Sequence, residues 1–338
     1  MSTVALVALA RPTFDLACAQ ANFDSARVLL TQLGATVVGP SELVMTVEDV
    51  AAVQLPHADL HILFMASFSD ASPAVELLGK VKGPVLGWSM REPGAVGDRL
   101  KLNSMCGVNL AAHALMNAGQ SIRHIHGNAD EPQVRAAIKD ALAGKLPEAS
   151  APKTVSGEFG SEADAQKALD WLRGKKIGAV GEAPIGFTPC IYDAKQIFST
   201  FGLDIRQISI DDAFGRISEV KEEERELAYA SAVAAQPSLA AVNVAEAKKV
   251  YGVEVALDAW RKEEVLDAIA IRCWPEFPTD LGACICSSLG RLSDRGTVTT
   301  CERDVLGAVT MMVCESLGSD ENYLVDIVDL DASQGLVR

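Results

Sequence analysis

Two carboxylates near the end of the sequence, Glu302 and Asp326, have the chemistry and spacing that divalent-metal binding or proton transfer requires. Glu302 begins a helical stripe of apolar residues, and Asp326 interrupts the apolar run 323–328. A helix over residues 302–317 rises about 23 Å, and an extended return to Asp326 covers about 20 Å. The two carboxylates are therefore predicted to meet at the edge of an α/β layer where ligand sites form.

Each carboxylate also has a structural interpretation. Thr299 and Glu302 are three positions apart before an apolar stripe, which is the pattern of a capping box that only satisfies backbone donors. Asp326 is costly to bury in an apolar strand unless a cation or hydrogen bonds compensate. The alternative is a strand that emerges early and leaves Asp326, Asp329 and Asp331 in water.

The elements around these residues alternate between strands and helices, which is typical of parallel α/β layers. Strands are predicted at residues 4–10, 35–38, 60–65, 84–88, 122–125, 176–180, 204–210, 268–273 and 323–328. A Pro-, Gly- and Ser-rich stretch interrupts the alternation. We predict two Rossmann-like parallel-sheet domains in tandem: an N-terminal α/β domain (1–145), a linker (146–174) and a second α/β domain (175–338) that carries the acidic site.

Residues that follow predicted strands are further candidates, because the carboxyl ends of parallel strands share one edge. Trp274 and Glu276 follow strand 268–273 and are candidate substrate contacts. Other residues in this position are Arg11, Phe68, Asp70, Arg91 and Glu92. Each could instead be a solvated loop residue.

Several patterns have a weaker functional interpretation. The cysteines at positions 273, 284, 286 and 301 could hold zinc but lack paired CxxC spacing. His124 and His126 could share a strand face as ligands, or simply lie half-exposed near a turn. Gly178, Gly181 and Gly186 could approach a phosphate, but no complete phosphate-binding motif is present and tight turns are favoured.

Composition excludes several classes of protein. The 338 residues carry a formal net charge of −15, which argues against a nucleic-acid or anionic-membrane partner. No run of about 20 apolar residues suggests a membrane span. The N-terminal sequence lacks a basic region before its apolar run, so it is interpreted as a strand rather than a signal peptide. Eight scattered cysteines suit reduced, buried thiols, and a cytoplasmic location is predicted.

Four strings resemble the L-fucose isomerase and L-arabinose isomerase-like sugar isomerases: WSMREPGAV (88–96), NSMCG (103–107), CWPEFP (273–278) and CERDVLGA (301–308). The resemblance covers residues 4–331. It implies a metal-dependent aldose-ketose isomerase that uses Mn²⁺ or another divalent cation, with Glu302 and Asp326 as the acidic metal ligands. It also implies a homo-oligomer in which Arg11 of one subunit contacts the sugar bound by another.

The chain departs from this family pattern in its histidines. The family's third ligand is a histidine from a C-terminal domain, whereas the last histidine here is His126. The chain is therefore expected either to be a fragment or to lack a complete set of metal ligands.

The predicted function is the isomerisation of an unphosphorylated, open-chain sugar through an enediolate, with Glu302 and Asp326 as the acid/base pair. A related sugar acid is a further possible substrate. The competing prediction is a non-catalytic sugar-binding or regulatory protein, because two linked α/β domains are also the layout of proteins that close over a sugar.

Overall fold

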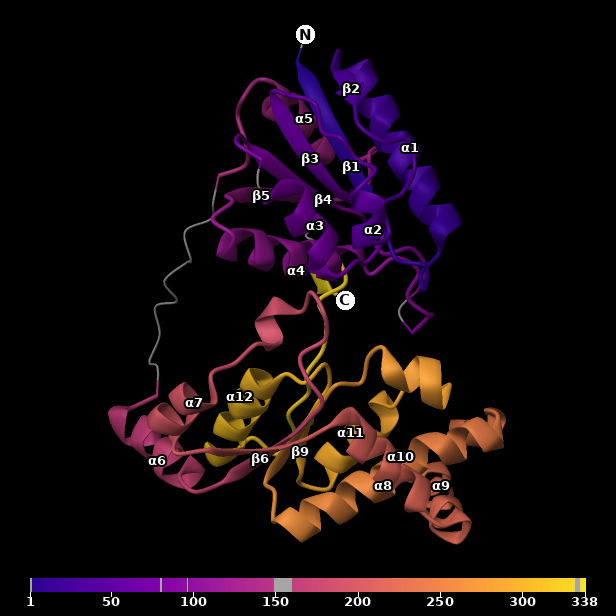
Figure 1. Cartoon of the computed structure of the whole chain (residues 1–338), viewed down its shortest axis with the longest axis vertical. Coiled ribbons are helices and arrows are strands. Elements are labelled where there is room, and N and C mark those ends of the chain that lie inside the picture. Colours follow the sequence, from indigo (N-terminus) through magenta and orange to yellow (C-terminus); the bar gives the residue numbers. More distant parts are fainter. Residues whose placement is uncertain (1, 80, 96, 149–159, 332–334) are drawn as a thin grey trace. The chain divides into compact units, whose positions relative to one another are not determined.

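The computed structural model describes residues 2–79, 81–95, 97–148, 160–331 and 335–338. The chain divides into two compact units (Figure 1). Unit 1 comprises Met1–Val155, Ile185–Thr188 and Val325–Arg338, and unit 2 comprises Ser156–Pro184 and Pro189–Leu324. This grouping differs from the domain bounds predicted from the sequence, which stay a prediction. Residues 149–159 of the predicted linker lie outside the described residues.

Unit 1 is built around a five-stranded parallel sheet with strand order β2-β1-β3-β4-β5. Its strands are β1 (Thr3–Leu9), β2 (Thr36–Val38), β3 (Leu60–Met65), β4 (Val85–Ser89) and β5 (Ile122–His126). Its helices are α1 (Leu16–Gln32), α2 (Val47–Val50), α3 (Ala71–Leu78), α4 (Ser104–Asn117) and α5 (Pro132–Leu142). A short antiparallel pair, β10 (Leu330–Asp331) and β11 (Leu336–Val337), completes the unit.

Both faces of this sheet are buried. Nearly every side chain of β1 and β3 is buried, and successive side chains of a strand point to opposite sides of the sheet. Leu6 and Phe64 pack with Phe23 of α1 and Ile138 of α5. The opposite face packs against helices α3 and α4. In Figure 1 the helices accordingly lie on both sides of the sheet. Near-continuous apolar strands are the expected sequence of a doubly covered parallel sheet.

Unit 2 repeats the architecture with a four-stranded parallel sheet of order β7-β6-β8-β9. Its strands are β6 (Lys176–Val180), β7 (Asp204–Ile208), β8 (Ala268–Ile271) and β9 (Val298–Thr300). Its helices are α6 (Glu162–Leu172), α7 (Ala194–Phe201), α8 (Ile210–Glu219), α9 (Glu222–Ala235), α10 (Val244–Glu264), α11 (Cys286–Asp294) and α12 (Val305–Ser316). Helices α8, α10 and α11 pack on one face, and α6, α7 and α12 on the other.

The predicted fold class of two parallel-sheet α/β units is confirmed. One predicted element is wrong: residues 323–328 are irregular rather than a strand. Tyr323 is 83% exposed and Val325 is 61% exposed, so this run lacks the packing that an apolar strand needs. Within the described residues, no helix has the length and apolar composition needed to cross a membrane.

Candidate active site

Glu302 lies immediately beyond strand β9, at the carboxyl edge of the unit 2 sheet. It is not in the first turn of helix α12, because that helix begins at Val305 and is capped by Asp304, whose Oδ1 accepts the backbone N–H of Gly307 at 2.7 Å. Thr299 belongs to strand β9. The capping-box interpretation of Thr299 and Glu302 is therefore wrong, since neither residue caps the helix.

The turn that presents Glu302 has an unusual backbone. Glu302 and Arg303 have φ angles of 55° and 57°, consecutive left-handed conformations that L-residues other than glycine rarely adopt. The backbone N–H of Glu302 donates to Sγ of Cys273 at 3.4 Å, and that of Arg303 to the carbonyl of Ile271 at 2.9 Å. Such strain persists only where the surroundings enforce it, and it clusters at functional sites.

Arg303 is a buried cation beside Glu302 that the sequence analysis did not identify. The residue is 6% exposed, and Nη2 donates to the hydroxyl of Tyr192 and to Oε1 of Gln207, both at 3.1 Å. Its guanidinium also lies 4.9 Å from the centre of the Tyr192 ring. The one feature of the sequence that could have pointed to Arg303 is its position within CERDVLGA, next to the predicted carboxylate.

Trp274 and Glu276 occupy the loop after strand β8, at the same edge as Glu302. Both side chains are partly buried. Glu276 forms a two-point ion pair with Arg272, through Nε to Oε2 at 2.9 Å and Nη2 to Oε1 at 2.5 Å. This pair fixes the loop that follows the strand.

Thiols surround the Glu302 turn. Burial, reinforced by the negative charges of Asp304 and Glu302, raises the pKa of Cys190 to about 12. Burial also raises the pKa of Cys286. Both thiols are thus protonated at neutral pH, and the buried Cys190 behaves as a small apolar group.

Asp326 belongs to unit 1, where it follows the last residues of unit 2 along the chain. Its Oδ2 accepts a hydrogen bond from Nδ2 of Asn103 at 3.3 Å. Asn103 itself is 6% exposed, has a φ of 47°, and stands before helix α4. Three consecutive backbone N–H groups there, of residues 101–103, donate to the buried carboxylate of Glu92.

Arg11 lies beyond strand β1, beside the loop after β3, as the sequence predicts for a residue at the carboxyl edge. Its backbone N–H donates to Oγ of Ser67 at 3.0 Å, and its Nη2 lies 3.7 Å from Oδ2 of Asp70. Its guanidinium is 5.8 Å from the centre of the Phe68 ring. Of the predicted site residues, Arg11 and Asp326 therefore belong to unit 1, and Trp274, Glu276 and Glu302 to unit 2.

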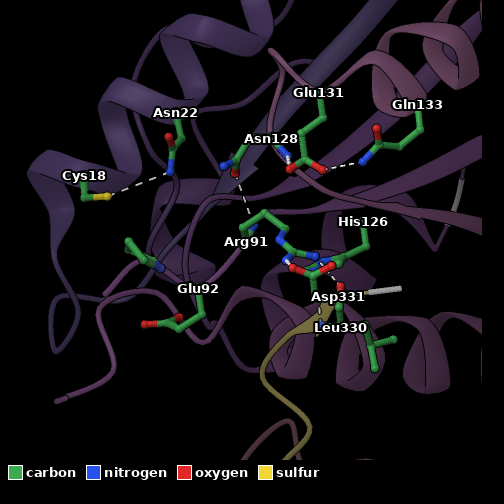
Figure 2. Close-up of a pocket in the computed structure, with 11 residues that line it drawn as sticks. Cys18, Asn22, Arg91, Glu92, His126, Asn128, Glu131, Gln133, Leu330 and Asp331 are labelled. Atoms are coloured by element: carbon green, nitrogen blue, oxygen red, sulfur yellow. Dashed lines mark hydrogen bonds and ion pairs between the residues drawn. The ribbon is translucent and has the colours of Figure 1, made fainter. Parts of the chain in front are cut away.

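Unit 1 contains a cavity of about 670 Å³ that is lined by two of the candidates that follow a predicted strand, Arg91 and Glu92, but by none of the five predicted catalytic or substrate-binding residues. Figure 2 shows the side chains around it, which come from helices α1 and α5, from the end of strand β5, from the segments after β4 and β5, and from β10. Arg91 and His126 meet the carboxylates of the C-terminal segment here. Nη2 of Arg91 lies 2.8 Å from Oδ2 of Asp331, and Nε2 of His126 lies 2.6 Å from Oδ1 of Asp329.

No group of three or more His, Cys, Asp or Glu side chains among the described residues is arranged to hold a metal ion. The zinc interpretation of the cysteines and the metal interpretation of His124 and His126 are therefore not supported. His124 Nε2 and His126 Nδ1 instead each form a hydrogen bond with Oγ of Ser89, at 2.8 Å.

Gly178 packs inside strand β6, where an added Cβ would lie 2.6 Å from the Trp260 ring, so its role is packing rather than phosphate binding.

These features define the class: an α/β protein whose polar side chains gather at the carboxyl edges of two parallel sheets, the usual place for a small-molecule site in such folds. No known family profile matches the chain. The sequence is 30% identical over 336 residues to "Sulfoquinovose isomerase" from Alkalicoccus urumqiensis, a match that covers 98% of this chain and 70% of that protein.

Proteins of the same name from Priestia aryabhattai and from Clostridium sp. (strain MSTE9) are each 28% identical. The matches cover 99% of this chain and 71% and 70% of those proteins. The chain belongs to the sulfoquinovose isomerase family of sugar isomerases. The narrower resemblance to L-fucose and L-arabinose isomerases is not confirmed by these matches.

Proposed function

We propose that this chain interconverts an open-chain aldose and its ketose, and that its substrate is a sulfonated sugar of the sulfoquinovose kind. The observation that carries the proposal is the match to sulfoquinovose isomerases along 98–99% of the sequence. The position of Glu302 supports it, because a carboxylate held by a left-handed turn at a sheet's carboxyl edge is suitably placed for chemistry.

In the proposed reaction, a carboxylate removes the proton from C2 of the open-chain aldose to give an enediolate. Protonation at C1 and transfer of the hydroxyl proton from O2 to O1 then give the ketose, so no atoms are gained or lost. Glu302 and Asp326 form the proposed acid/base pair. Arg11, Trp274 and Glu276 are the proposed substrate contacts, supplying a cation, an aromatic surface and a hydrogen-bond acceptor.

A divalent cation, Mn²⁺ in the first instance, is part of the proposal. Carboxylate oxygens are the donors that hard cations prefer, and Glu302 and Asp326 would hold the ion. When bound, it would polarise the sugar carbonyl and stabilise the enediolate. No three ligand side chains come together among the described residues, and Glu302 and Asp326 are the two ligands that we propose. Dialysis against EDTA should abolish activity, and Mn²⁺ should restore it.

The deciding experiment incubates the chain with sulfoquinovose in D₂O and follows the sugar by NMR. The expected result is a ketose product and exchange of deuterium into C1 or C2. Glu302→Gln and Asp326→Asn should each lower the rate by about 10²–10⁴-fold, the usual range for general acid-base groups. Glu321→Gln and Asp320→Asn are matched controls, because these exposed side chains lie outside the proposed site.

The competing non-catalytic function makes the opposite prediction. A chain that binds the sugar, with or without Mn²⁺, but gives neither product nor deuterium exchange would be a sugar-binding protein and would refute the isomerase proposal.

We also propose that the protein forms a homo-oligomer and is located in the cytoplasm. Light scattering after size-exclusion chromatography tests the assembly, and fractionation of the source cells tests the location.

A further inference from the structure

Eight of the eleven side chains that line the cavity of unit 1 carry planar donor or acceptor groups. It is formed by Cys18, Asn22, Arg91, Glu92, Pro93, His126, Asn128, Glu131, Gln133, Leu330 and Asp331. Its volume of about 670 Å³ falls within the range of roughly 300–1,000 Å³ typical of small-molecule sites. It also lies beyond the carboxyl ends of β4 and β5, where open α/β sheets bind ligands.

Hydrogen bonds among the lining residues hold several of these groups in place. Oδ1 of Asn128 accepts the backbone N–H of Arg91 at 3.3 Å, which leaves the Asn128 amide nitrogen to donate elsewhere. Glu131 accepts the backbone N–H of Asn128 at 2.6 Å and the side-chain amide of Gln133. Figure 2 shows Asn22, Asn128 and Arg91 on neighbouring sides of the cavity. Side chains fixed in this way lose little entropy on binding a ligand.

The charge balance of the cavity disfavours an anionic ligand group. The guanidinium of Arg91 is already paired with Asp331 and lies 3.5 Å from Asp329, while His126 contacts Asp329. Glu131 adds a further carboxylate to the lining. A sulfonate placed here would have to displace carboxylates that are already paired, whereas a neutral hydroxyl can donate to a carboxylate and accept from an amide at the same time.

We propose that this cavity binds the neutral, hydroxyl-bearing part of a sugar, with Asn22 and Gln133 as specificity-determining contacts. The inference deepens the proposed function, on which it rests for the sugar as ligand. It assigns the cavity to hydroxyl recognition and places recognition of the sulfonate outside it.

The test is ligand-observed NMR titration of the chain with sulfoquinovose, D-glucose and inorganic sulfate. D-glucose, which lacks the sulfonate, should bind, and inorganic sulfate should not displace it. Asn22→Ala and Gln133→Ala should each weaken both sugars by about tenfold, the effect of losing one hydrogen bond. Gln166→Ala, on an exposed position of helix α6, is the matched control and should change nothing.

Displacement of D-glucose by sulfate, or failure of D-glucose to bind, would show that the cavity does not recognise a neutral hydroxyl-bearing ligand and would overturn the inference. Sugar binding that both variants leave unchanged, or no binding at all, would overturn it too. Catalysis is tested separately. Sugar binding that depends on Asn22 and Gln133 without isomerisation would refute only the proposed function. Isomerisation with unchanged KM in both variants would refute only the assignment of the cavity.

Discussion

The side-chain amide of Asn103 donates to the carboxylate of Asp326 at 3.3 Å, although the two residues are 223 positions apart in the sequence. Asn103 is buried in a left-handed conformation, and the adjoining backbone is held by Glu92. Two strings that carried the resemblance, around Glu92 and Asn103, thus act together to present one donor to Asp326. Asn103 is a positioning residue for the proposed acid/base carboxylate.

Removing that donor should impair catalysis. In Asn103→Ala, kcat/KM is expected to fall about tenfold, the effect of one lost hydrogen bond to a charged group. Asn103→Asp should be worse, because it places a second carboxylate against Asp326. The comparison is with Asn117→Ala, an exposed residue of helix α4. Equal kcat/KM for parent and Asn103→Asp would show that the contact has no part in the reaction.

The left-handed backbone at Glu302 predicts that a glycine variant at this position is more stable than an alanine variant. With a φ of 55°, position 302 favours glycine, whereas an alanine keeps about 1–2 kcal/mol of left-handed strain. Both Glu302→Gly and Glu302→Ala lack the carboxylate and should be inactive. The free energy of unfolding measured in urea should nevertheless be higher for the glycine variant by about 1 kcal/mol. A more stable alanine variant would contradict the left-handed geometry.

Sequence periodicity predicted the buried strands well, because strands such as 60–65 are apolar on both faces in a doubly covered sheet. It failed at residues 323–328, where apolar composition alone suggested a strand but no packing partner covers Tyr323. It also missed strand β9, since the three residues Val298–Thr300 are too short for a periodic signal. The two elements expected to bring Glu302 to a sheet edge, a helix from residue 302 and a strand at 323–328, are not the ones observed, because Glu302 follows β9 and precedes α12. The contacts of Arg303 and Asn103 depend on distant segments and could not be predicted locally.

His124 should make the fold sensitive to mild acid. Burial lowers the pKa of His124 to about 4 from an ordinary value of 6.5. Between these values the unfolded chain binds a proton that the folded chain does not, so this contribution to stability is complete above pH 6.5 and is lost as the pH falls toward 4. The loss approaches about 3 kcal/mol.

Replacing His124 with asparagine should remove this part of the pH dependence. Urea unfolding at pH 7 and pH 4.5 should show a smaller difference for His124→Asn than for the parent. His57→Asn, at an exposed histidine, is the control and should retain the parent's difference. If both variants behave like the parent, His124 is not the titrating group.

Gly178 should tolerate no side chain. A Cβ at this position in strand β6 would lie 2.5 Å from Cδ1 of Leu266 and 2.6 Å from the ring of Trp260. Gly178→Ala is therefore expected to lower the free energy of unfolding by about 1–3 kcal/mol, the usual cost of overpacking a core. Gly215→Ala, in helix α8 with open space around its Cα, should not destabilise. Urea denaturation of the two variants measures the difference.

The cysteines should differ in their reactivity with alkylating reagents according to their burial. Cys190 is 6% exposed and burial raises its pKa to about 12, so almost none of it is thiolate at pH 8. Cys284 and Cys314 are exposed. Iodoacetamide at pH 8 followed by mass spectrometry should label Cys284 and Cys314 in the folded chain, and Cys190 only after denaturation. Rapid labelling of native Cys190 would mean that the Glu302 turn opens to solvent, contrary to the packing that fixes its left-handed conformation.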